Sequence, residues 1–346
     1  MKKYFQSFRA SLAVIISIVF LAVMVLFIHL FTPVSFEDKW KEVQVPEGVT
    51  YSQGITILIN EGMIRNKLVF LVLGRITKID RKLRAGFYKL STSMTPYEIF
   101  DRLRKGRVLE FMITIPEGSD LNDIRMALKA NSLIDDASWK IVRDREFLRA
   151  LNIDAPSLEG YLFPETYLFA KGTSPKDIFA TMVDKMREGF DQTLKRRAEE
   201  LGMNENTILT LASIIEKEAA ADEERPLVSA VLHNRLKKNM RLQMDPTVIY
   251  GVKRMGEVIT REDLKKQTPY NTYVIDGLPP GPISSPGIKS IQAALYPAKT
   301  DYLFFVSRND GRHHFSSSNK EHEKAVQMYQ RGNKDTSGEK DNNKIK

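Results

Sequence analysis

The chain has 346 residues, of which 42% are hydrophobic and 27% are charged, so it is long enough for two or three folded units and its composition excludes wholesale disorder. It contains no cysteine, which excludes disulfides and thiolate metal sites. Its formal net charge is +9, but Lys and Arg are interspersed with acids and form no basic block among aromatic residues, so a nucleic-acid-binding protein is not indicated.

The first predicted element is an apolar helix at Ser11–Phe31, a segment without Asp, Glu, Lys or Arg. A helix of this length rises about 30 Å, which is the thickness of a bilayer's hydrocarbon core. Lys2, Lys3 and Arg9 precede it, so the positive-inside rule places residues 1–10 in the cytoplasm. A cleaved signal peptide is the alternative, but the apolar run is long for one and no small-x-small cleavage site follows. We therefore expect an uncleaved single-pass anchor.

Two segments of the chain resemble each other. Val43–Ile64 and Ile113–Ile134 align without gaps, and each predicts a short strand, a Pro-Glu-Gly turn, a helix and a turn that ends in Ile. Between them lie a second strand, Arg84–Leu90, and a helix that Thr95 can cap. These elements predict a small α/β module over residues 32–110, similar to the LysM domains that bind glycan chains. A spacer without a ligand is the alternative.

From about Asp136 the pattern becomes mostly helical. The aromatic-rich segment Ser157–Phe169 interrupts it, and we expect either a core-lining loop or the wall of a cleft, because aromatic faces suit sugar rings. The run "GLPPGPISSPG", Gly277–Gly287, predicts a rigid loop at the rim of a cleft. Residues 332–346 contain almost no apolar side chains and should be disordered. The remaining predicted elements are helices at 206–221, 224–238, 288–296 and 319–331, and a strand at 301–307.

The stretch "LASIIEKEAA" holds two glutamates in a segment that is otherwise suited to burial. A helical projection places Glu218 in the middle of the apolar face and Glu216 on the opposite side, where we expect an ordinary solvated residue. Burying an ionised carboxylate costs several kcal/mol unless the group is paired or takes up a proton. Glu218 therefore has two interpretations: a structural ion pair with Arg235 or Arg241, or a cleft carboxyl with a raised pKa that protonates a glycosidic oxygen.

Several longer phrases resemble one family, the membrane-anchored endolytic murein transglycosylases, or MltG/YceG-like proteins. The resemblance runs from Ser11 to Arg331 and implies an α+β architecture: a single transmembrane helix, a LysM-like module at 32–110, and a larger, mostly helical, lysozyme-like catalytic domain with short strands at 111–331. The phrases that carry it are "LASIIEKEA", "NRLKKNMRLQMDPTVIYG", "TPYNTYVIDGLPPGPISSPG", "ALYPAKTDYLFFV" and "EGYLFPETY".

The resemblance implies that Glu218, the second acid of I-E-K-E, is the catalytic residue. The implied reaction cleaves the β-1,4 bond between N-acetylmuramic acid and N-acetylglucosamine without water and leaves a 1,6-anhydro end. Such a scheme uses one carboxyl group as acid and then base, whereas hydrolysing glycosidases use two. It implies no cofactor, peptidoglycan strands as substrate, penicillin-binding peptidoglycan synthases as partners, and a cell inner membrane location with the catalytic domain in the periplasm.

The same resemblance and the aromatic segment supply candidates for orienting the substrate. For each, a structural role remains open: hairpin hydrogen bonds for Gln243, a helix N-cap for Asp245, and loop tethering for Asn271 and Tyr273. The candidates are Gln243, Asp245, Asn271, Tyr273, Tyr161 and Glu165.

Two rival functions remain. One is a non-catalytic, membrane-anchored peptidoglycan-binding scaffold of the wall-synthesis machinery. The other is a hydrolase in which Asp222 or Asp245 provides a second carboxylate. No metal site is expected, because no two histidines have a one-turn helical spacing and the adjacent pair His313 and His314 lies beside a predicted strand, where neighbours face opposite ways.

Overall fold

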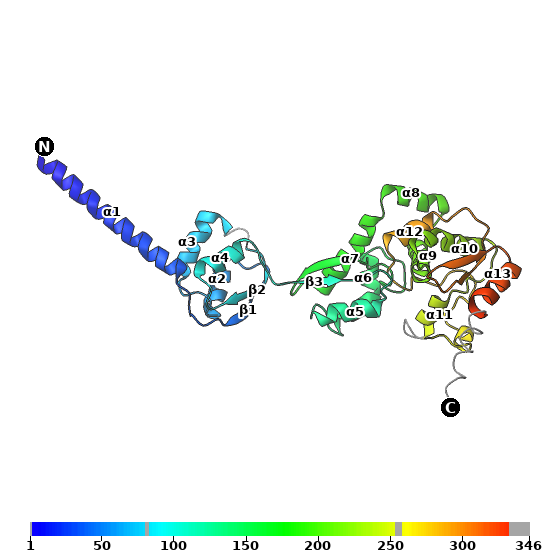
Figure 1. Ribbon diagram of the computed structural model, residues 1–346. Helices are drawn as coiled ribbons and strands as arrows, with labels where there is room; N and C mark the ends of the chain where they lie inside the picture. The colour runs from blue at the N-terminus through cyan, green and yellow to red at the C-terminus, as the bar shows by residue number, and fades with distance from the viewer. Residues whose placement is uncertain (1, 80–82, 253–257, 332–346) are drawn as a thin grey trace, which may run out of the picture. The chain divides into compact units, whose positions relative to one another are not determined.

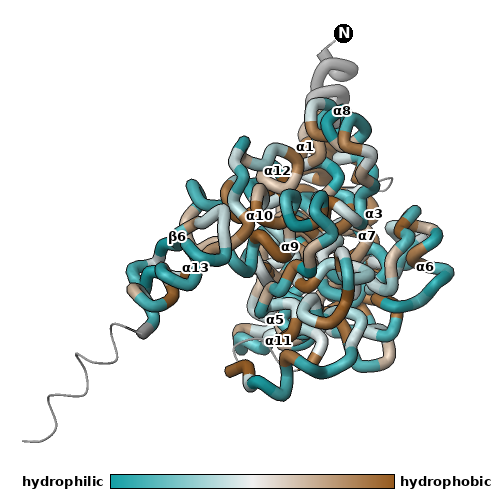
Figure 2. The backbone as a smooth tube through the Cα atoms, turned by 90° about the vertical axis from the view of Figure 1, so that its right-hand side faces the viewer, coloured by the Kyte–Doolittle hydropathy of each residue, from teal (hydrophilic) through white to brown (hydrophobic). Residues whose placement is uncertain are grey.

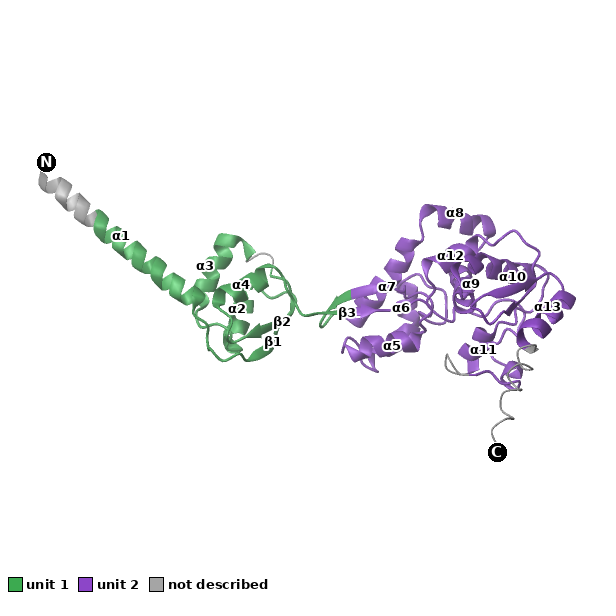
Figure 3. Ribbon diagram, viewed as in Figure 1, with its two compact units in different colours: residues 1–112, 168–173 green, residues 113–167, 174–346 purple. Residues whose placement is uncertain are grey.

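The structure is a computed structural model that describes residues 2–79, 83–252 and 258–331. Two compact units divide the chain: unit 1 comprises residues 1–112 and 168–173, and unit 2 comprises 113–167 and 174–346 (Figure 3). The tail 332–346, for which the sequence predicts disorder, lies outside the described residues.

The chain begins with the helix α1, Lys2–Phe31 (Figure 1). Its segment Leu12–Phe31 has a mean hydropathy of 3.0, and none of it is buried within the protein. A row of exposed Ile, Val, Leu and Phe side chains is stable only where water is excluded. The helix is thus compatible with a membrane anchor or a signal sequence. It begins earlier than expected, at Lys2, but its apolar segment agrees with the expected span Ser11–Phe31 within one residue.

Unit 1 is a small α/β structure built around an antiparallel strand pair. The strands β1 (Trp40–Val45) and β2 (Gly86–Ser91) pair with Trp40 opposite Ser91. Its core is formed by side chains of both strands and of the helices, among them Tyr88, Leu90 and Ile99. One helix, α3, was not predicted from the sequence. The helices of this unit after α1 are α2 (Tyr51–Asn60), α3 (Lys67–Thr77) and α4 (Pro96–Arg104).

The internal similarity corresponds to a repeated local structure. In each copy a strand leads through a Pro-Glu-Gly turn whose glycine, Gly48 or Gly118, has a φ of 73° or 75°, a left-handed conformation that favours glycine. Thr50 and Asp120 then close capping boxes at the starts of α2 and of α5, Leu121–Ala130. The repeat prediction is therefore confirmed at the level of strand, turn and helix.

Unit 2 is mostly helical, with short two-stranded sheets (Figure 1). Most predicted helices are present with slightly shifted ends, and the predicted strand 301–307 is shortened to β5. Its helices are α5, α6 (Arg145–Ala150), α7 (Pro175–Gly189), α8 (Gln192–Leu201), α9 (Glu205–Glu218), α10 (Arg225–Lys237), α11 (Asp245–Val252), α12 (Ile288–Leu295) and α13 (Asn319–Val326), with short 3-10 turns at Ser138–Arg143, Asp222–Glu224 and Asp263–Lys265 and a π turn at Gln327–Arg331. Its strands β5 (Phe304–Ser307) and β6 (His313–Ser316) pair antiparallel. The strands β3 (Glu110–Thr114) and β4 (Thr166–Ala170) form another pair, and the division between the two units falls within these two strands.

Helix α9 is the central helix of unit 2. Every residue from Ile208 to Ile215 is buried, because α10, α11 and α12 pack around it. Figure 2 colours each residue by its hydropathy and shows hydrophobic residues at α9 and mostly hydrophilic residues at α13. The helix is therefore covered on more than the one face that a projection of its sequence indicates.

The expectation for Glu216 was wrong for this reason. Its side chain is only 7% exposed, and its carboxylate accepts hydrogen bonds from Arg225 Nη1 at 3.0 Å and from the backbone N–H of Gly287 at 2.9 Å. Arg225 begins α10 and Gly287 caps α12. Glu216 thus connects three helices instead of facing solvent.

The loop "GLPPGPISSPG" also differs from expectation, because residues 281–287 are buried. Ser213 of α9 accepts a hydrogen bond from the backbone N–H of Ile283 at 3.0 Å, and Gly118 donates to the carbonyl of Ser285 at 2.8 Å. Gly160, with a φ of 79°, lies so close that a Cβ there would be 2.3 Å from Pro282 Cβ. The loop therefore fixes α9 from inside and does not form a cleft rim.

Candidate active site around Glu218

A cavity of about 470 Å³ opens within unit 2 at the C-terminal end of α9. It is formed where α9, α10, the start of α11 and the β5–β6 hairpin meet, with α13 on one side. Both polar and aromatic side chains line it, which is typical of ligand sites. The lining residues that the argument uses are Glu218, Arg235, Gln243, Asp245, Tyr273, Phe304, His313 and His322.

Glu218 is the last residue of α9, and its carboxyl group lines this cavity. Within the described part of the chain it forms no hydrogen bond or ion pair. Burial raises its pKa to about 8, the negative charge of Asp245 raises it further, and the positive charge of Arg235 opposes both. Glu218 is therefore a mainly protonated carboxylic acid at neutral pH and is free to act on a ligand.

Neither of the two arginines considered for a structural ion pair holds Glu218. Arg235 donates to the carbonyl of Leu303 at 2.7 Å, and its guanidinium lies 5.2 Å from the ring centre of Phe304. Arg241 donates to Asp276 at 3.1 Å. Between the two interpretations that the sequence left open, the contacts favour the cleft carboxyl, while Arg235 places a positive charge nearby.

Asp245 and Tyr273 form a hydrogen-bonded pair in the cavity wall. The Tyr273 hydroxyl donates to Asp245 Oδ1 at 2.6 Å, and burial raises the pKa of Tyr273 so that it stays protonated. Asp245 is the first residue of α11 and not the residue before it, so the N-cap interpretation does not describe its contacts. The pair instead holds a negative charge near Glu218, which favours the protonated acid.

Gln243 lines the same cavity from a strained backbone. Its φ of 53° is left-handed, which is uncommon for a residue with a Cβ and costs roughly 1–3 kcal/mol. Its N–H donates to the carbonyl of Thr272 at 3.1 Å, and its Oε1 accepts from Arg235 at 3.4 Å. These contacts fix the conformation and leave the amide NH₂ group as a donor for a ligand.

The other three sequence candidates lie outside the lining of this cavity. Asn271 is fully buried and donates to the carbonyls of Leu264 and Lys266, which is the loop-tethering role that the sequence left open. Tyr161 is also buried and donates to Asn206 Oδ1 at 3.3 Å. Glu165 is exposed and accepts from the N–H of its neighbour Thr166.

His313 of β6 is a cavity residue that sequence reasoning missed. Its Nδ1 lies 2.7 Å from Glu224 Oε2, and its backbone N–H donates to Glu224 Oε1 at 2.8 Å. Glu224 is buried, so the pair fixes the imidazole ring and its tautomer. His322 is stacked on Phe304 with ring centres 5.2 Å apart. The β5–β6 hairpin and α13 bring these residues to the lining of the Glu218 cavity, and neither sequence spacing nor helical period reveals that.

In the described residues no group of three or more His, Asp and Glu side chains is arranged to hold a metal ion. The chemistry that the cavity supports is proton transfer by Glu218 beside one arginine, one fixed histidine and an amide donor.

Comparisons with known proteins identify the family. The model of the YceG-like family matches residues 43–328. A Bacillus subtilis (strain 168) protein named endolytic murein transglycosylase is 34% identical over 319 residues, which are 87% of this chain and 88% of that protein. A protein of the same name from Streptococcus pneumoniae (strain D39) is 30% identical, and the match covers 83% of this chain and 58% of that protein.

A solved structure agrees with the sequence comparisons. The crystal structure of a yceG-like protein from Listeria monocytogenes is 35% identical, has a TM-score of 0.57, and is matched over 83% of this chain and 99% of that one. The family that the sequence motifs indicated is thus confirmed: this chain belongs to the YceG-like family.

Proposed function

We propose that the chain is an endolytic peptidoglycan lytic transglycosylase that cleaves the β-1,4 bond between N-acetylmuramic acid and N-acetylglucosamine and leaves a 1,6-anhydro end. The observation that carries the proposal is the state of Glu218: a cavity-lining carboxyl without a partner among the described residues, whose pKa is raised to about 8. The names of the Bacillus and Streptococcus relatives support the substrate class.

In the first step Glu218 acts as a general acid. Its proton moves to the glycosidic oxygen of N-acetylglucosamine while the bond from that oxygen to C1 of the muramyl ring breaks. Glu218 becomes a carboxylate in this step, and the positive charge of Arg235 stabilises it. The negative charge of Asp245 acts before the reaction: it raises the pKa of Glu218 and so keeps this residue protonated until substrate binds.

In the second step the carboxylate of Glu218 acts as a base. It takes the proton of the muramyl C6 hydroxyl, whose oxygen bonds to C1 and closes the anhydro ring. No water enters the product, and Glu218 regains the proton that it lost, so one carboxyl group suffices. Its raised pKa makes the carboxylate a stronger base than an ordinary glutamate.

The other cavity residues position the substrate in this proposal. The Gln243 amide is a donor for the acetamide carbonyl, and the Glu224-fixed ring of His313 presents its second nitrogen as a further hydrogen-bonding group. Phe304 supplies an apolar wall. These groups orient the sugar so that its C6 hydroxyl and C1 are close when the bond breaks.

A hydrolase would need a second carboxylate near Glu218. Of the two candidates from the sequence, Asp245 lines the Glu218 cavity and keeps this alternative open. Asp222, the other, forms ion pairs with Arg225 and Lys289 and does not line the Glu218 cavity. A hydrolase adds water to the new reducing end, whereas a lytic transglycosylase does not. The mass of the product therefore distinguishes the two.

Unit 1 and α1 complete the proposal. The strand–helix–helix–strand order of β1, α2, α3 and β2 supports a LysM-like glycan-binding role for this unit. The apolar helix Leu12–Phe31 supports a single-pass anchor with the N-terminus in the cytoplasm and the catalytic unit outside the cell inner membrane. In that location the enzyme would meet strands released by penicillin-binding peptidoglycan synthases.

The proposal is tested with the full-length chain in detergent and uncrosslinked glycan strands. We expect internal cleavage products with anhydro ends from the unaltered protein and none from Glu218→Gln. The control is Glu165→Gln, an exposed carboxylate outside the cavity that should keep full activity. A Glu218→Gln variant that cleaves normally, or that retains full activity in cells, would indicate a non-catalytic scaffold.

A further inference from the structure

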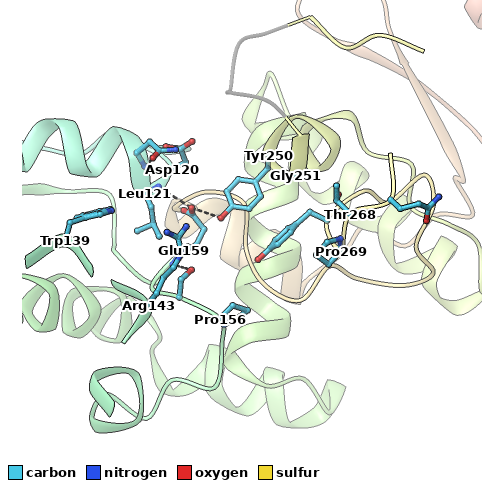
Figure 4. A pocket seen from close by; sticks show the side chains of 14 residues that line it. Asp120, Leu121, Trp139, Arg143, Pro156, Glu159, Tyr250, Gly251, Thr268 and Pro269 are labelled. Carbon is cyan, nitrogen blue, oxygen red and sulfur yellow. Dashed lines mark hydrogen bonds between the residues drawn. The ribbon is translucent and has the colours of Figure 1, made fainter. Parts of the chain in front are cut away.

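Unit 2 contains a second cavity, of about 520 Å³, which the reaction at Glu218 does not use (Figure 4). It lies between the start of α5, the turn that carries Glu159, the end of α11 and the loop 267–270. Its volume is within the range of small-molecule sites, about 300–1,000 Å³. Figure 4 shows the hydroxyl of Tyr250 pointing toward Glu159, with the side chain of Arg143 beside them.

Glu159 in this cavity is only half satisfied. The residue is 3% exposed, and one carboxyl oxygen, Oε2, accepts from both the N–H of Leu121 at 3.2 Å and the hydroxyl of Tyr250 at 3.0 Å. The other oxygen, Oε1, is buried without a hydrogen-bond partner in the part of the chain that the structure describes. A buried polar atom without a partner costs about 1–3 kcal/mol, which a hydrogen bond from a ligand would offset.

A second polar atom of the same cavity is in the same condition. The hydroxyl of Thr268 is buried and has no hydrogen-bond partner among the described residues. Thr268 and Glu159 both line the cavity, although they come from segments far apart in the chain. Two residues that line one cavity thus each have a buried polar atom without a described partner, and a ligand in this cavity that contacts these atoms would supply the missing hydrogen bonds.

The lining indicates what kind of ligand fits. Burial raises the pKa of Glu159 to about 8, although the hydrogen bonds from Leu121 and Tyr250 oppose this, so Glu159 is mainly a neutral acid at neutral pH. A neutral carboxyl donates and accepts, and the threonine hydroxyl does the same. Together they match the C=O and N–H of an acetamide group. The rings of Tyr250 and Tyr270, with centres 4.8 Å apart, add apolar surface for a sugar.

The two cavities share the elements that form their walls. Asp245, at the first residue of α11, lines the Glu218 cavity, and Tyr250, five residues later on the same helix, lines the second cavity. Five helical residues span about 7.5 Å along the axis. The segment after α11 also contributes to both cavities: Thr268 lines the second cavity, and Tyr273 lines the Glu218 cavity. Because each helical residue turns by about 100°, Asp245 and Tyr250 lie about 140° apart around α11, so a strand that occupies both cavities passes around this helix as well as along it.

We propose that the Glu159 cavity is a distal subsite that binds an N-acetylated sugar of the same glycan strand whose bond is cleaved at Glu218. This inference rests on the proposed function, because it assigns the strand to both cavities. It makes binding dependent on strand length: long strands occupy both cavities, and short ones occupy the first alone. The distance between the subsites would then set how near a strand end the cut can fall.

The test measures binding separately from cleavage. Peptide-free strands of defined length are titrated calorimetrically into full-length Glu218→Gln protein in detergent, with and without Thr268→Val. The Thr268 hydroxyl has no partner to lose, so its removal should not weaken the fold. We expect about tenfold weaker binding of long strands, which corresponds to one hydrogen bond of about 1.4 kcal/mol. Binding of a disaccharide should not change.

Thr300→Val is the matched control. Thr300 also carries a buried hydroxyl without a described partner, but it lines neither cavity. Equal binding of long strands by the Thr268→Val and Thr300→Val proteins would overturn the subsite. Peptide-bearing strands are titrated in parallel, and a loss confined to them would also overturn it, because it would indicate a peptide site. Failure of the proposed function is separate: it would appear as absence of anhydro products when the unaltered protein acts on long strands.

Discussion

Glu216 and Glu218 lie two positions apart at the end of α9, yet only Glu216 is held by an arginine. Glu216 lies 3.0 Å from Arg225 Nη1 in a buried ion pair, whereas Glu218 lines a cavity without a described partner and its pKa is raised to about 8. The helix thus ends with one structural acid and one acid available for chemistry. The predictions below separate these roles.

Replacing Glu216 with Ala should destabilise unit 2. The substitution leaves Arg225 without one of its buried partners and removes the acceptor for the N–H of Gly287 at the start of α12. Breaking a buried pair in this way costs about 3–5 kcal/mol. The matched control is Glu223→Ala, which removes an exposed partner of Arg312 and should cost less than about 1 kcal/mol. Chemical denaturation measures both, and equal losses would contradict the structural role of Glu216.

Replacing Glu218 with Gln should stabilise the protein, increasingly so as pH rises. The folded-state pKa of about 8 lies above the ordinary 4.5, so the native state holds a proton that the unfolded chain loses. The stability of the unaltered protein therefore falls between about pH 4.5 and 8, and Gln does not titrate. The difference in Tm between variant and unaltered protein should grow across this interval and level off above it. A difference independent of pH would show that the Glu218 pKa is not raised.

The activity of the enzyme should decline as pH rises through about 8, because Glu218 must be protonated to act as the acid. Asp245→Asn should move this decline to lower pH, since the charge of Asp245 contributes to the raised pKa of Glu218. The pH dependence of kcat/KM measures the shift. A profile that moves to higher pH or does not move would contradict the electrostatic role of Asp245, and complete inactivity at every pH would favour the two-carboxylate hydrolase.

His313→Gln should lower kcat by about tenfold or more with a smaller change in KM, because its ring lines the cavity and is fixed by Glu224. His314→Gln provides the control: the residue is adjacent in β6, exposed, and outside the cavity lining. Steady-state kinetics on uncrosslinked strands compares the two. Similar kcat values for both variants would remove His313 from the site.

Local signals predicted the repeated strand–turn–helix units and the position of Glu218 on the apolar face of its helix, because turn glycines, capping residues and apolar periods act within a few residues. Interactions between distant segments were missed. Glu216 was assigned to solvent because a projection of α9 does not include α10 and α12. His313 and Glu159 acquire their surroundings only when segments far apart in the sequence meet. Asn271 is polar and lies in a motif, but its NH₂ group donates to the carbonyls of Leu264 and Lys266 and its Oδ1 accepts from the N–H of Tyr273.

The most direct test of the central assignment is the mass of the new glycan ends made by the full-length protein from uncrosslinked strands. If Glu218 acts alone, first as acid and then as base, the new ends are anhydro ends, each lighter by one water than a reducing end, and the Glu218→Gln protein does not cleave. Reducing ends that contain the extra water, or unchanged cleavage by Glu218→Gln, would contradict it.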